Sequence, residues 1–176
     1  ATVSNELTRV LDLLKSAKRK ALPELLELAH ANLIASPVAA AAIDMAMYDL
    51  LAKEAKLPAW KLLGGNQNRI PTAGTIPFLS LHSTIRQAQA LHKQGFQTLR
   101  IVGGGSWEEE AERVIKVREK LGAIPTLIFD AEEGFSSDDT LKFSESVLPH
   151  EVFCIEQPLP REKKQELVEV ASQCVI

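Results

Sequence analysis

Residues 127–135, LIFDAEEGF, join an apolar run to a cluster of carboxylates formed by Asp130, Glu132 and Glu133. Residues 152–156, VFCIE, repeat the arrangement further along the chain, with Glu156 closing a second apolar run. Both runs have the length and composition of buried strands. Because the carboxyl ends of parallel strands meet at one edge of a sheet, the two runs predict an acidic site at that edge.

The chain after Ile70 alternates short apolar runs with amphipathic stretches. Strands are expected at 70–78, 97–102, 125–130 and 152–156. Helices are expected at 83–94, 107–121, 137–148 and 161–173, and residues 171–176 are expected to lead into a fifth strand. Strands separated by helices pair in parallel, and their apolar character predicts a sheet covered on both faces. The pattern indicates an α/β fold, whether a closed barrel or an open sheet.

The residues before Ile70 show a different pattern of apolar positions. From Glu6 to about Lys56 apolar residues recur at helical spacing, and Pro37 fits the first turn of an alanine-rich helix. The glycines and asparagines of residues 62–69, LLGGNQNR, predict a turn and a domain junction. We therefore expect a helical domain over residues 1–66 and an α/β domain over residues 67–176.

Charge and composition exclude several classes of partner. The 20 basic and 23 acidic residues give a net charge of −3, without a basic stripe for nucleic acid. No apolar run approaches the about 20 residues that span a bilayer, and the first residues lack a signal pattern, so we expect no membrane partner. Cys154 and Cys174 lie on or beside apolar runs, which predicts two buried thiols in the reducing cytoplasm.

Asp130 and Glu156 are the candidate metal ligands. Carboxylates at consecutive strand ends can converge on a hard cation such as Mg²⁺, which prefers oxygen ligands. The alternative is that each carboxylate caps the following helix or pairs with a loop. Glu132 and Glu133 either contact the ligand residues and hold them in position or are simply solvated.

Arg100 and Thr75 are candidate substrate-binding residues. Arg100, near the end of the second expected strand, can hold a substrate carboxylate with two hydrogen bonds or can pair with Asp130. Thr75 can line a pocket, although strand propensity explains it equally well.

The glycines at 103–105 follow a strand and precede a helix, as in a phosphate-binding loop. They lack a further glycine at the required offset, and the glutamates at 108–110 would repel phosphate. A flavodoxin-like nucleotide-binding protein is therefore disfavoured.

Four stretches together resemble the enolase superfamily, and its muconate-lactonizing branch most. They are AAAAIDMAMYDLLAKEAKLPAWKLLGG at 39–65, GFQTLRIVGG at 95–104, LIFDAEEGF at 127–135 and IEQPLP at 155–160. That branch includes dipeptide epimerases, N-acylamino acid racemases and o-succinylbenzoate synthases. The resemblance implies helices of an α+β capping domain followed by a partial (β/α) barrel of about four to five βα units.

The resemblance also implies a chemistry. Members of the superfamily abstract a proton next to a carboxylate, and Mg²⁺ stabilises the resulting enediolate. By this likeness Asp130 is the first metal ligand, Glu156 the second, and Gln157 follows it in the signature and supports it. Glu132 stands where the family usually has Asn. Arg100 replaces the first lysine of a Lys-x-Lys pair, so it is the candidate for an electrostatic catalytic role.

Some features of the family are not matched. Either Val102 stands at the position of the second lysine, the family's acid–base residue, or one residue has been lost there, and in both cases no lysine occupies the position. The third metal ligand and an opposing lysine would come from a fifth and a sixth strand, beyond residue 176, and the opening sheet of the capping domain has no counterpart. From these differences we expect an incomplete enzyme in this chain.

Two hypotheses follow. The first is a Mg²⁺-dependent racemase, epimerase or lyase that acts on a small carboxylate derived from an amino acid, resembling dipeptide or N-acylamino acid epimerases or o-succinylbenzoate synthase. The second is an inactive half-barrel that serves as a structural or self-associating module. An unpaired strand edge invites self-association, so a homo-oligomer is expected.

Overall fold

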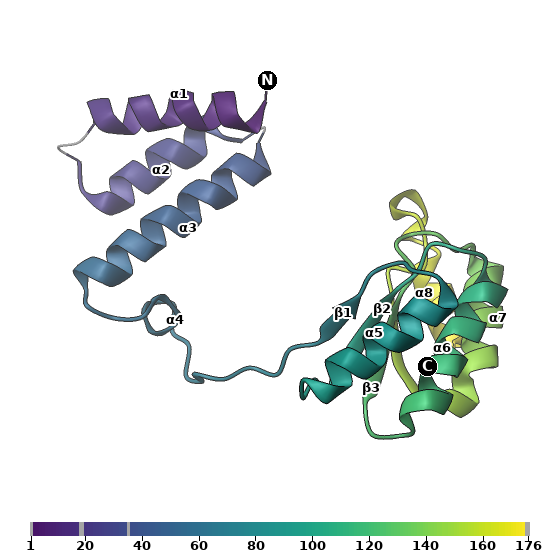
Figure 1. Ribbon diagram of the computed structural model, residues 1–176. Helices are drawn as coiled ribbons and strands as arrows, with labels where there is room; N and C mark the ends of the chain where they lie inside the picture. The colour runs from purple at the N-terminus through teal and green to yellow at the C-terminus, as the bar shows by residue number, and fades with distance from the viewer. Residues whose placement is uncertain (1, 18–19, 35, 175–176) are drawn as a thin grey trace. The chain divides into compact units, whose positions relative to one another are not determined.

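The computed structural model describes residues 2–17, 20–34 and 36–174, and it divides into two compact units, Ala1–Ile70 and Pro71–Ile176 (Figure 1). The first unit is helical, as expected. Its helices are α1 (Val3–Ser16), α2 (Leu22–Asn32), α3 (Pro37–Glu54) and the short α4 (Ala59–Leu62).

The helices α1, α2 and α3 pack around a small apolar core. Its buried residues are Val10, Ala29, Leu33, Ala39, Ile43 and Met47. Pro37 occupies the first turn of α3, where its missing N–H costs no helical hydrogen bond. His30 of α2 forms a hydrogen bond with Asp44 of α3, so this histidine joins two helices instead of only ending one.

The second unit contains a four-stranded parallel sheet in the order β1-β2-β3-β4. The strands are β1 (Gly74–Ile76), β2 (Thr98–Val102), β3 (Thr126–Asp130) and β4 (Val152–Glu156). The connections contain α5 (Leu81–Lys93), α6 (Trp107–Leu121), α7 (Ser137–Val147) and the 3-10 turn η1 (Leu148–His150). After β4 come the 3-10 turn η2 (Arg161–Lys163) and α8 (Leu167–Gln173). The α/β class predicted from the alternating pattern is confirmed.

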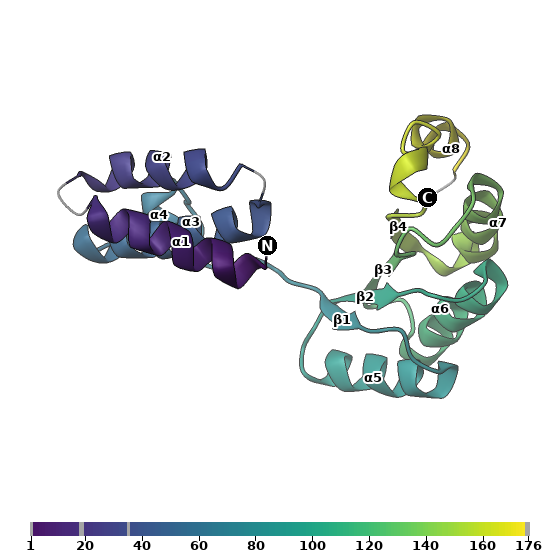
Figure 2. The ribbon, with the colours of Figure 1, turned by 90° about the horizontal axis from the view of Figure 1, so that it is seen from above.

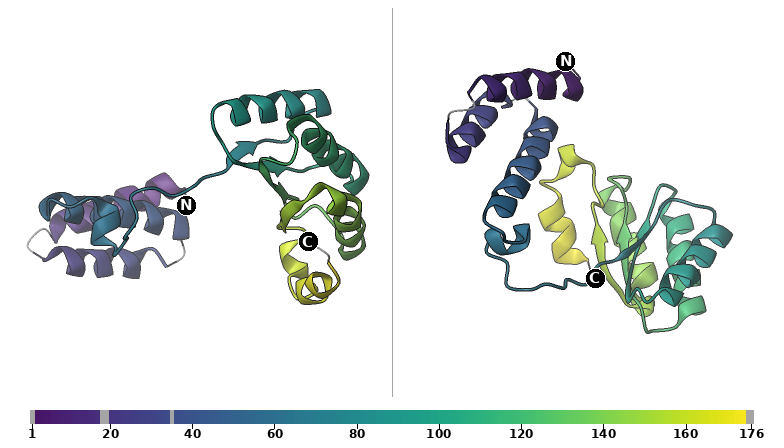
Figure 3. Two further views of the ribbon diagram at one scale, coloured as in Figure 1. Left: turned by 90° about the horizontal axis from the view of Figure 1, so that it is seen from below. Right: turned by 60° about the vertical axis from the view of Figure 1, so that its left-hand side comes forward.

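The helices α5, α6 and α7 lie outside the curved sheet, on the same face (Figure 2). The view from below shows the same layering (Figure 3). Strands that follow each other without reversal, with helices on one face, are typical of a (β/α) barrel. A flavodoxin-like sheet reverses its strand order and carries helices on both faces. The strand order therefore gives no support to the nucleotide-binding alternative.

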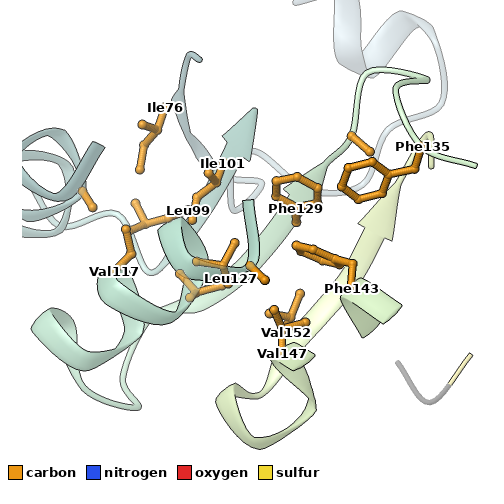
Figure 4. Packing of buried hydrophobic residues seen from close by; sticks show 14 of the residues in the cluster. Ile76, Leu99, Ile101, Val117, Leu127, Phe129, Phe135, Phe143, Val147 and Val152 are labelled. Carbon is orange, nitrogen blue, oxygen red and sulfur yellow. The ribbon is translucent and has the colours of Figure 1, made fainter. Parts of the chain in front are cut away.

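The core lies between the sheet and these helices (Figure 4). Leu99, Ile101, Leu127 and Phe129 alternate along β2 and β3 and are buried. The Phe129 ring centroid lies 4.4 Å from that of Phe143 on α7. Their neighbours along each strand point to the opposite face. Within residues 71–174, which contain the sheet, the helices lie on one face only, so the expected cover of the second face is not provided by these residues.

Two further expectations need correction. The first strand is shorter than residues 70–78, and it ends at Ile76 because Pro77 has no N–H for the ladder. Residues 161–173 form a 3-10 turn and a separate helix instead of one helix. Residues 171–173 lie in that helix, and the expected fifth strand includes residues 175 and 176, which lie outside the described residues.

The cysteines also differ from expectation. Cys154 and Cys174 are half-buried and unoxidised, and both line a cavity of about 120 Å³ between β4 and α8. Burial raises the pKa of the Cys154 thiol, and the charge of Glu156 adds to the effect.

Within the described part of the chain, no helix is both long and apolar enough to cross a bilayer.

Candidate functional site at the carboxyl ends of the strands

Asp130 and Glu156 lie side by side at the carboxyl ends of β3 and β4. Their Cα atoms are register partners in the parallel ladder. Asp130 is fully buried, whereas the side chain of Glu156 is 44 % exposed. Two adjacent carboxylates repel each other unless a positive charge lies between them. The sheet thus creates a position where a cation is required.

Arg100 supplies a positive charge at this position. It lies on β2 in register with Ile128, two residues before Asp130, so both side chains project from the face of the sheet without helices. Its Nη2 donates to Asp130 Oδ2. Its Nε donates to Glu156 Oε2 at 2.7 Å. The hydrogen bond to Glu156 raises the pKa of Arg100 above its ordinary value. The predicted pairing of Arg100 with Asp130 is present and extends to Glu156.

Hydrogen bonds between backbone atoms connect the two loops that follow Asp130 and Glu156. Ala131 N–H donates to Glu156 O at 3.0 Å, and Glu133 N–H donates to Gln157 O at 2.8 Å. Glu132, Glu133 and Gln157 have φ values of 51°, 62° and 45°, in the left-handed region that non-glycine residues seldom adopt. Such backbone strain gathers at functional sites because the surrounding structure holds it in place.

The remaining candidates take different places around the carboxylates. Glu132 supports Asp130 through its backbone, because its N–H donates to Asp130 Oδ1 at 3.0 Å. Its side chain is exposed, as is that of Gln157, whose carbonyl joins the loops. Thr75 is exposed on β1 and is the register partner of Arg100, so it lies on the same open face.

Glu110 is a residue that the sequence analysis missed. It is fully buried at the start of α6, and its Oε1 accepts hydrogen bonds from Gly104 N–H at 3.0 Å and Gly105 N–H at 2.7 Å. Its other oxygen lies 3.2 Å from Arg113 Nη1 without forming a hydrogen bond. The N–H groups of the glycine loop are therefore occupied by a carboxylate of the same chain. An acidic residue in the first turn of a helix, behind a run of glycines, was the available signal.

The donor set fits a divalent cation through two ligands. Asp130 and Glu156 offer hard oxygen atoms that already converge on one positive group. Among the described residues, no group of three or more His, Cys, Asp or Glu side chains is placed to hold a metal ion. Asp130 and Glu156 are thus the residues of this chain that would hold Mg²⁺.

The fold and the site define a protein built on the first strands of a (β/α) barrel, with its acidic residues at the carboxyl ends of the strands. Residues 1–64 match the family described as mandelate racemase / muconate lactonizing enzyme, N-terminal domain. Residues 83–176 match the family described as enolase C-terminal domain-like. The chain belongs to this mandelate racemase and muconate lactonizing enzyme family of the enolase superfamily, which confirms the resemblance.

Several relatives are epimerases of dipeptides. The hydrophobic dipeptide epimerase of Enterococcus faecalis is 34% identical over 138 residues, which are 78% of this chain and 39% of the relative. The L-Lys-D/L-Arg epimerase of Desulforapulum autotrophicum is 33% identical over 75% of this chain and 37% of its own length. The chain thus spans slightly less than two fifths of the length of these two relatives.

Solved structures of relatives agree in fold. The dipeptide epimerase from Enterococcus faecalis, in complex with Mg and the dipeptide L-Leu-L-Tyr, aligns with a TM-score of 0.81 and 32% identity, covering 86% of this chain and 43% of that protein. The dipeptide epimerase from Methylococcus capsulatus, in complex with a Mg ion, aligns with a TM-score of 0.77 and 30% identity, covering 84% and 43%. These likenesses confirm a barrel-type architecture, of which this chain covers a part.

Proposed function

We propose that this chain carries the first part of the active site of a Mg²⁺-dependent epimerase that acts on dipeptides. The observation that carries the proposal is the convergence of Asp130 and Glu156 on one positive charge at the carboxyl ends of neighbouring strands. The likeness to dipeptide epimerases supports the substrate class. Racemisation of an N-acylamino acid and a lyase reaction of the o-succinylbenzoate synthase type remain the alternatives within the same chemistry.

Each site residue has a role in this proposal. Asp130 and Glu156 hold Mg²⁺, which when bound supplies the positive charge that stabilises negative charge developing next to the substrate carboxylate. Arg100 attracts the carboxylate of the dipeptide electrostatically, since a guanidinium matches a carboxylate with two hydrogen bonds. Thr75 lines the substrate side of the open face, next to Arg100 in register. Glu132 supports Asp130 through its backbone N–H, and the carbonyl of Gln157 accepts the Glu133 N–H and so joins the two ligand loops.

The proposal gives β2 no role in proton transfer. Val102 closes this strand as the register partner of Asp130, and its side chain cannot accept or donate a proton. Arg100 remains protonated at every accessible pH and is a poor base. A stereochemical inversion therefore needs an acid–base group other than those that β2 contributes.

Binding of a dipeptide tests the proposed function, because this chain is proposed to carry the metal ligands and the substrate-binding arginine but no acid–base group. The chain is titrated with a panel of dipeptides that includes L-Leu-L-Tyr, with and without Mg²⁺, and binding is followed by calorimetry. We expect saturable binding that is strengthened by Mg²⁺, and we expect the effect of Mg²⁺ to disappear in the double variant Asp130→Asn/Glu156→Gln. An effect of Mg²⁺ that survives in the double variant, or absence of binding for every dipeptide, would contradict the proposal.

The second candidate is a non-catalytic module that associates with itself. Two observations favour it: Val102 at the end of β2, and the pairing of both carboxylates with Arg100. The prediction of a homo-oligomer is common to both candidates, as is a cytoplasmic location. A dimer or larger assembly in light scattering, without Mg²⁺-dependent dipeptide binding, would favour the module over the epimerase.

A further inference from the structure

Arg100 occupies the point where the two candidate metal ligands meet. Its guanidinium donates from Nη2 to Asp130 Oδ2 and from Nε to Glu156 Oε2. The second oxygen of Asp130, Oδ1, accepts the Glu132 N–H at 3.0 Å. Both oxygens of the buried aspartate are therefore already engaged by the protein, and Glu156 uses one of its two.

A divalent cation and the guanidinium compete for the same oxygen atoms. Mg²⁺ binds carboxylates at about 2.0–2.1 Å and demands near-octahedral geometry, which leaves no room for an N–H on the same lone pair. It also places a double positive charge beside a guanidinium, and this repulsion acts across a partly buried site. This repulsion favours a state in which Arg100 has left at least the aspartate when a cation binds both Asp130 and Glu156.

We propose that Arg100 is a displaceable internal counter-ion, so that Mg²⁺ binding expels its guanidinium from between Asp130 and Glu156. The inference rests on the metal site of the proposed function and adds a competition to it. The side chain of Arg100 can turn toward solvent over the open face, because it is already 26% exposed and its register partner Thr75 is exposed on the same face. In the metal-free protein the single positive charge of the arginine lies between two adjacent carboxylates and reduces their repulsion.

The displacement couples the metal to the substrate. Once expelled, the guanidinium has lost its two internal acceptors and is available for an external carboxylate. Mg²⁺ and a dipeptide carboxylate should then each strengthen the binding of the other, by the same factor in both directions. An arginine that only held the substrate, without blocking the metal, would leave Mg²⁺ binding unchanged when it is removed.

Mg²⁺ titration calorimetry on three proteins tests the competition. The proteins are the unmodified chain, Arg100→Met, which removes the competing charge, and Arg100→Lys, which keeps the charge but loses the second hydrogen bond. We expect Arg100→Met to bind Mg²⁺ about tenfold or more tightly than the unmodified chain, because a charge-assisted hydrogen bond no longer has to be broken. Arg100→Lys should fall between them. Equal or weaker binding by a folded Arg100→Met would overturn the proposal.

An NMR measurement provides a test that does not depend on the Met variant folding. The Arg100 Nε–H signal, assigned by its absence from Arg100→Lys, reports its hydrogen bond to Glu156. We expect Mg²⁺ to shift this signal toward the position of a solvated arginine and to accelerate its exchange with water. A signal that stays unchanged while calorimetry shows Mg²⁺ bound would refute the displacement.

The outcomes separate this inference from the proposed function. Tighter Mg²⁺ binding by Arg100→Met, without Mg²⁺-dependent dipeptide binding by the unmodified chain, would keep the counter-ion and reject the epimerase. Mg²⁺-dependent dipeptide binding by the unmodified chain, with Mg²⁺ affinity independent of residue 100, would keep the epimerase and reject the counter-ion. Absence of Mg²⁺ binding by all three proteins would reject both.

Discussion

Arg100 and Arg118 lie at opposite ends of the same sheet and bind different kinds of partner. Arg100, at the carboxyl ends of the strands, pairs with the carboxylates of Asp130 and Glu156. Arg118, on α6, is buried at the other end and donates to backbone carbonyls that precede β3 and β4. Its acceptors, at 2.8–3.0 Å, are the carbonyls of Gly122, Pro125, His150 and Glu151.

The difference between the acceptors separates a structural role from a functional one. The acceptors of Arg118 are neutral carbonyls, which attract a competing cation less strongly than carboxylates do. Its four hydrogen bonds therefore have a structural role, because they connect α6 to the segments before β3 and β4. Its burial lowers the pKa of its guanidinium, and the carbonyls compensate the lost water. The carboxylates around Arg100 can exchange one cation for another. A guanidinium on carbonyls therefore fixes the fold, whereas one on carboxylates leaves a site that can be switched.

The largest expected effect on stability is at the Arg118 end. Arg118→Met leaves its four carbonyl acceptors without their donor, and we expect unfolding by urea to show a loss of at least about 3 kcal/mol. The matched control is Arg86→Met on the exposed surface of α5, which should stay within about 0.5 kcal/mol. Equal free energies of unfolding for the two variants would contradict a structural role for Arg118.

The glycine loop at the carboxyl ends should respond less strongly. Glu110→Ala removes the acceptor of the Gly104 and Gly105 N–H groups and the charge beside Arg113, for an expected loss of about 2 kcal/mol in the same urea measurement. Glu112→Ala, at an exposed position on the same helix, is the control and should change little. A Glu110 variant as stable as its control would mean that water replaces the carboxylate in the loop.

The smallest expected effect is at the helix caps. Ser106 caps α6 at the carboxyl ends of the strands, because its side chain accepts from Glu109 N–H in a capping box, and Ser106→Ala should cost about 1 kcal/mol. Ser80 precedes α5 in the same position without a capping hydrogen bond, so Ser80→Ala should be nearly neutral in thermal unfolding. Similar melting temperatures for the two variants would show that the Ser106 cap does not stabilise the start of α6.

The sequence predicted the parts of this arrangement that depend on local patterns. Apolar runs ending in Asp130 and Glu156 identified β3 and β4, because an apolar run is a local property of the sequence. The helices between these runs implied parallel pairing, which placed both carboxylates at one edge. The pairing of Arg100 with Asp130 was one of two open alternatives, and its second bond to Glu156 depends on the register of three strands. No periodicity encodes that register.

Glu110 and Arg118 escaped prediction for a related reason. Their burial depends on which loops pack over the two ends of α6, and their spacing alone is that of solvated helix residues. The cysteines were misjudged because apolar neighbours in sequence do not ensure cover on both faces of a strand. The half-burial of Cys154 follows from the open face of the sheet, which the apolar composition of β4 conceals.

Binding of Mn²⁺, a paramagnetic substitute for Mg²⁺, followed by EPR, tests directly whether Asp130 and Glu156 form a cation site. We predict saturable binding by the unmodified chain, its loss in Asp130→Asn/Glu156→Gln, and its retention in Glu132→Gln, which changes an exposed carboxylate of the same loop. Mn²⁺ binding that is equal in the double variant and in the unmodified chain would contradict the claim.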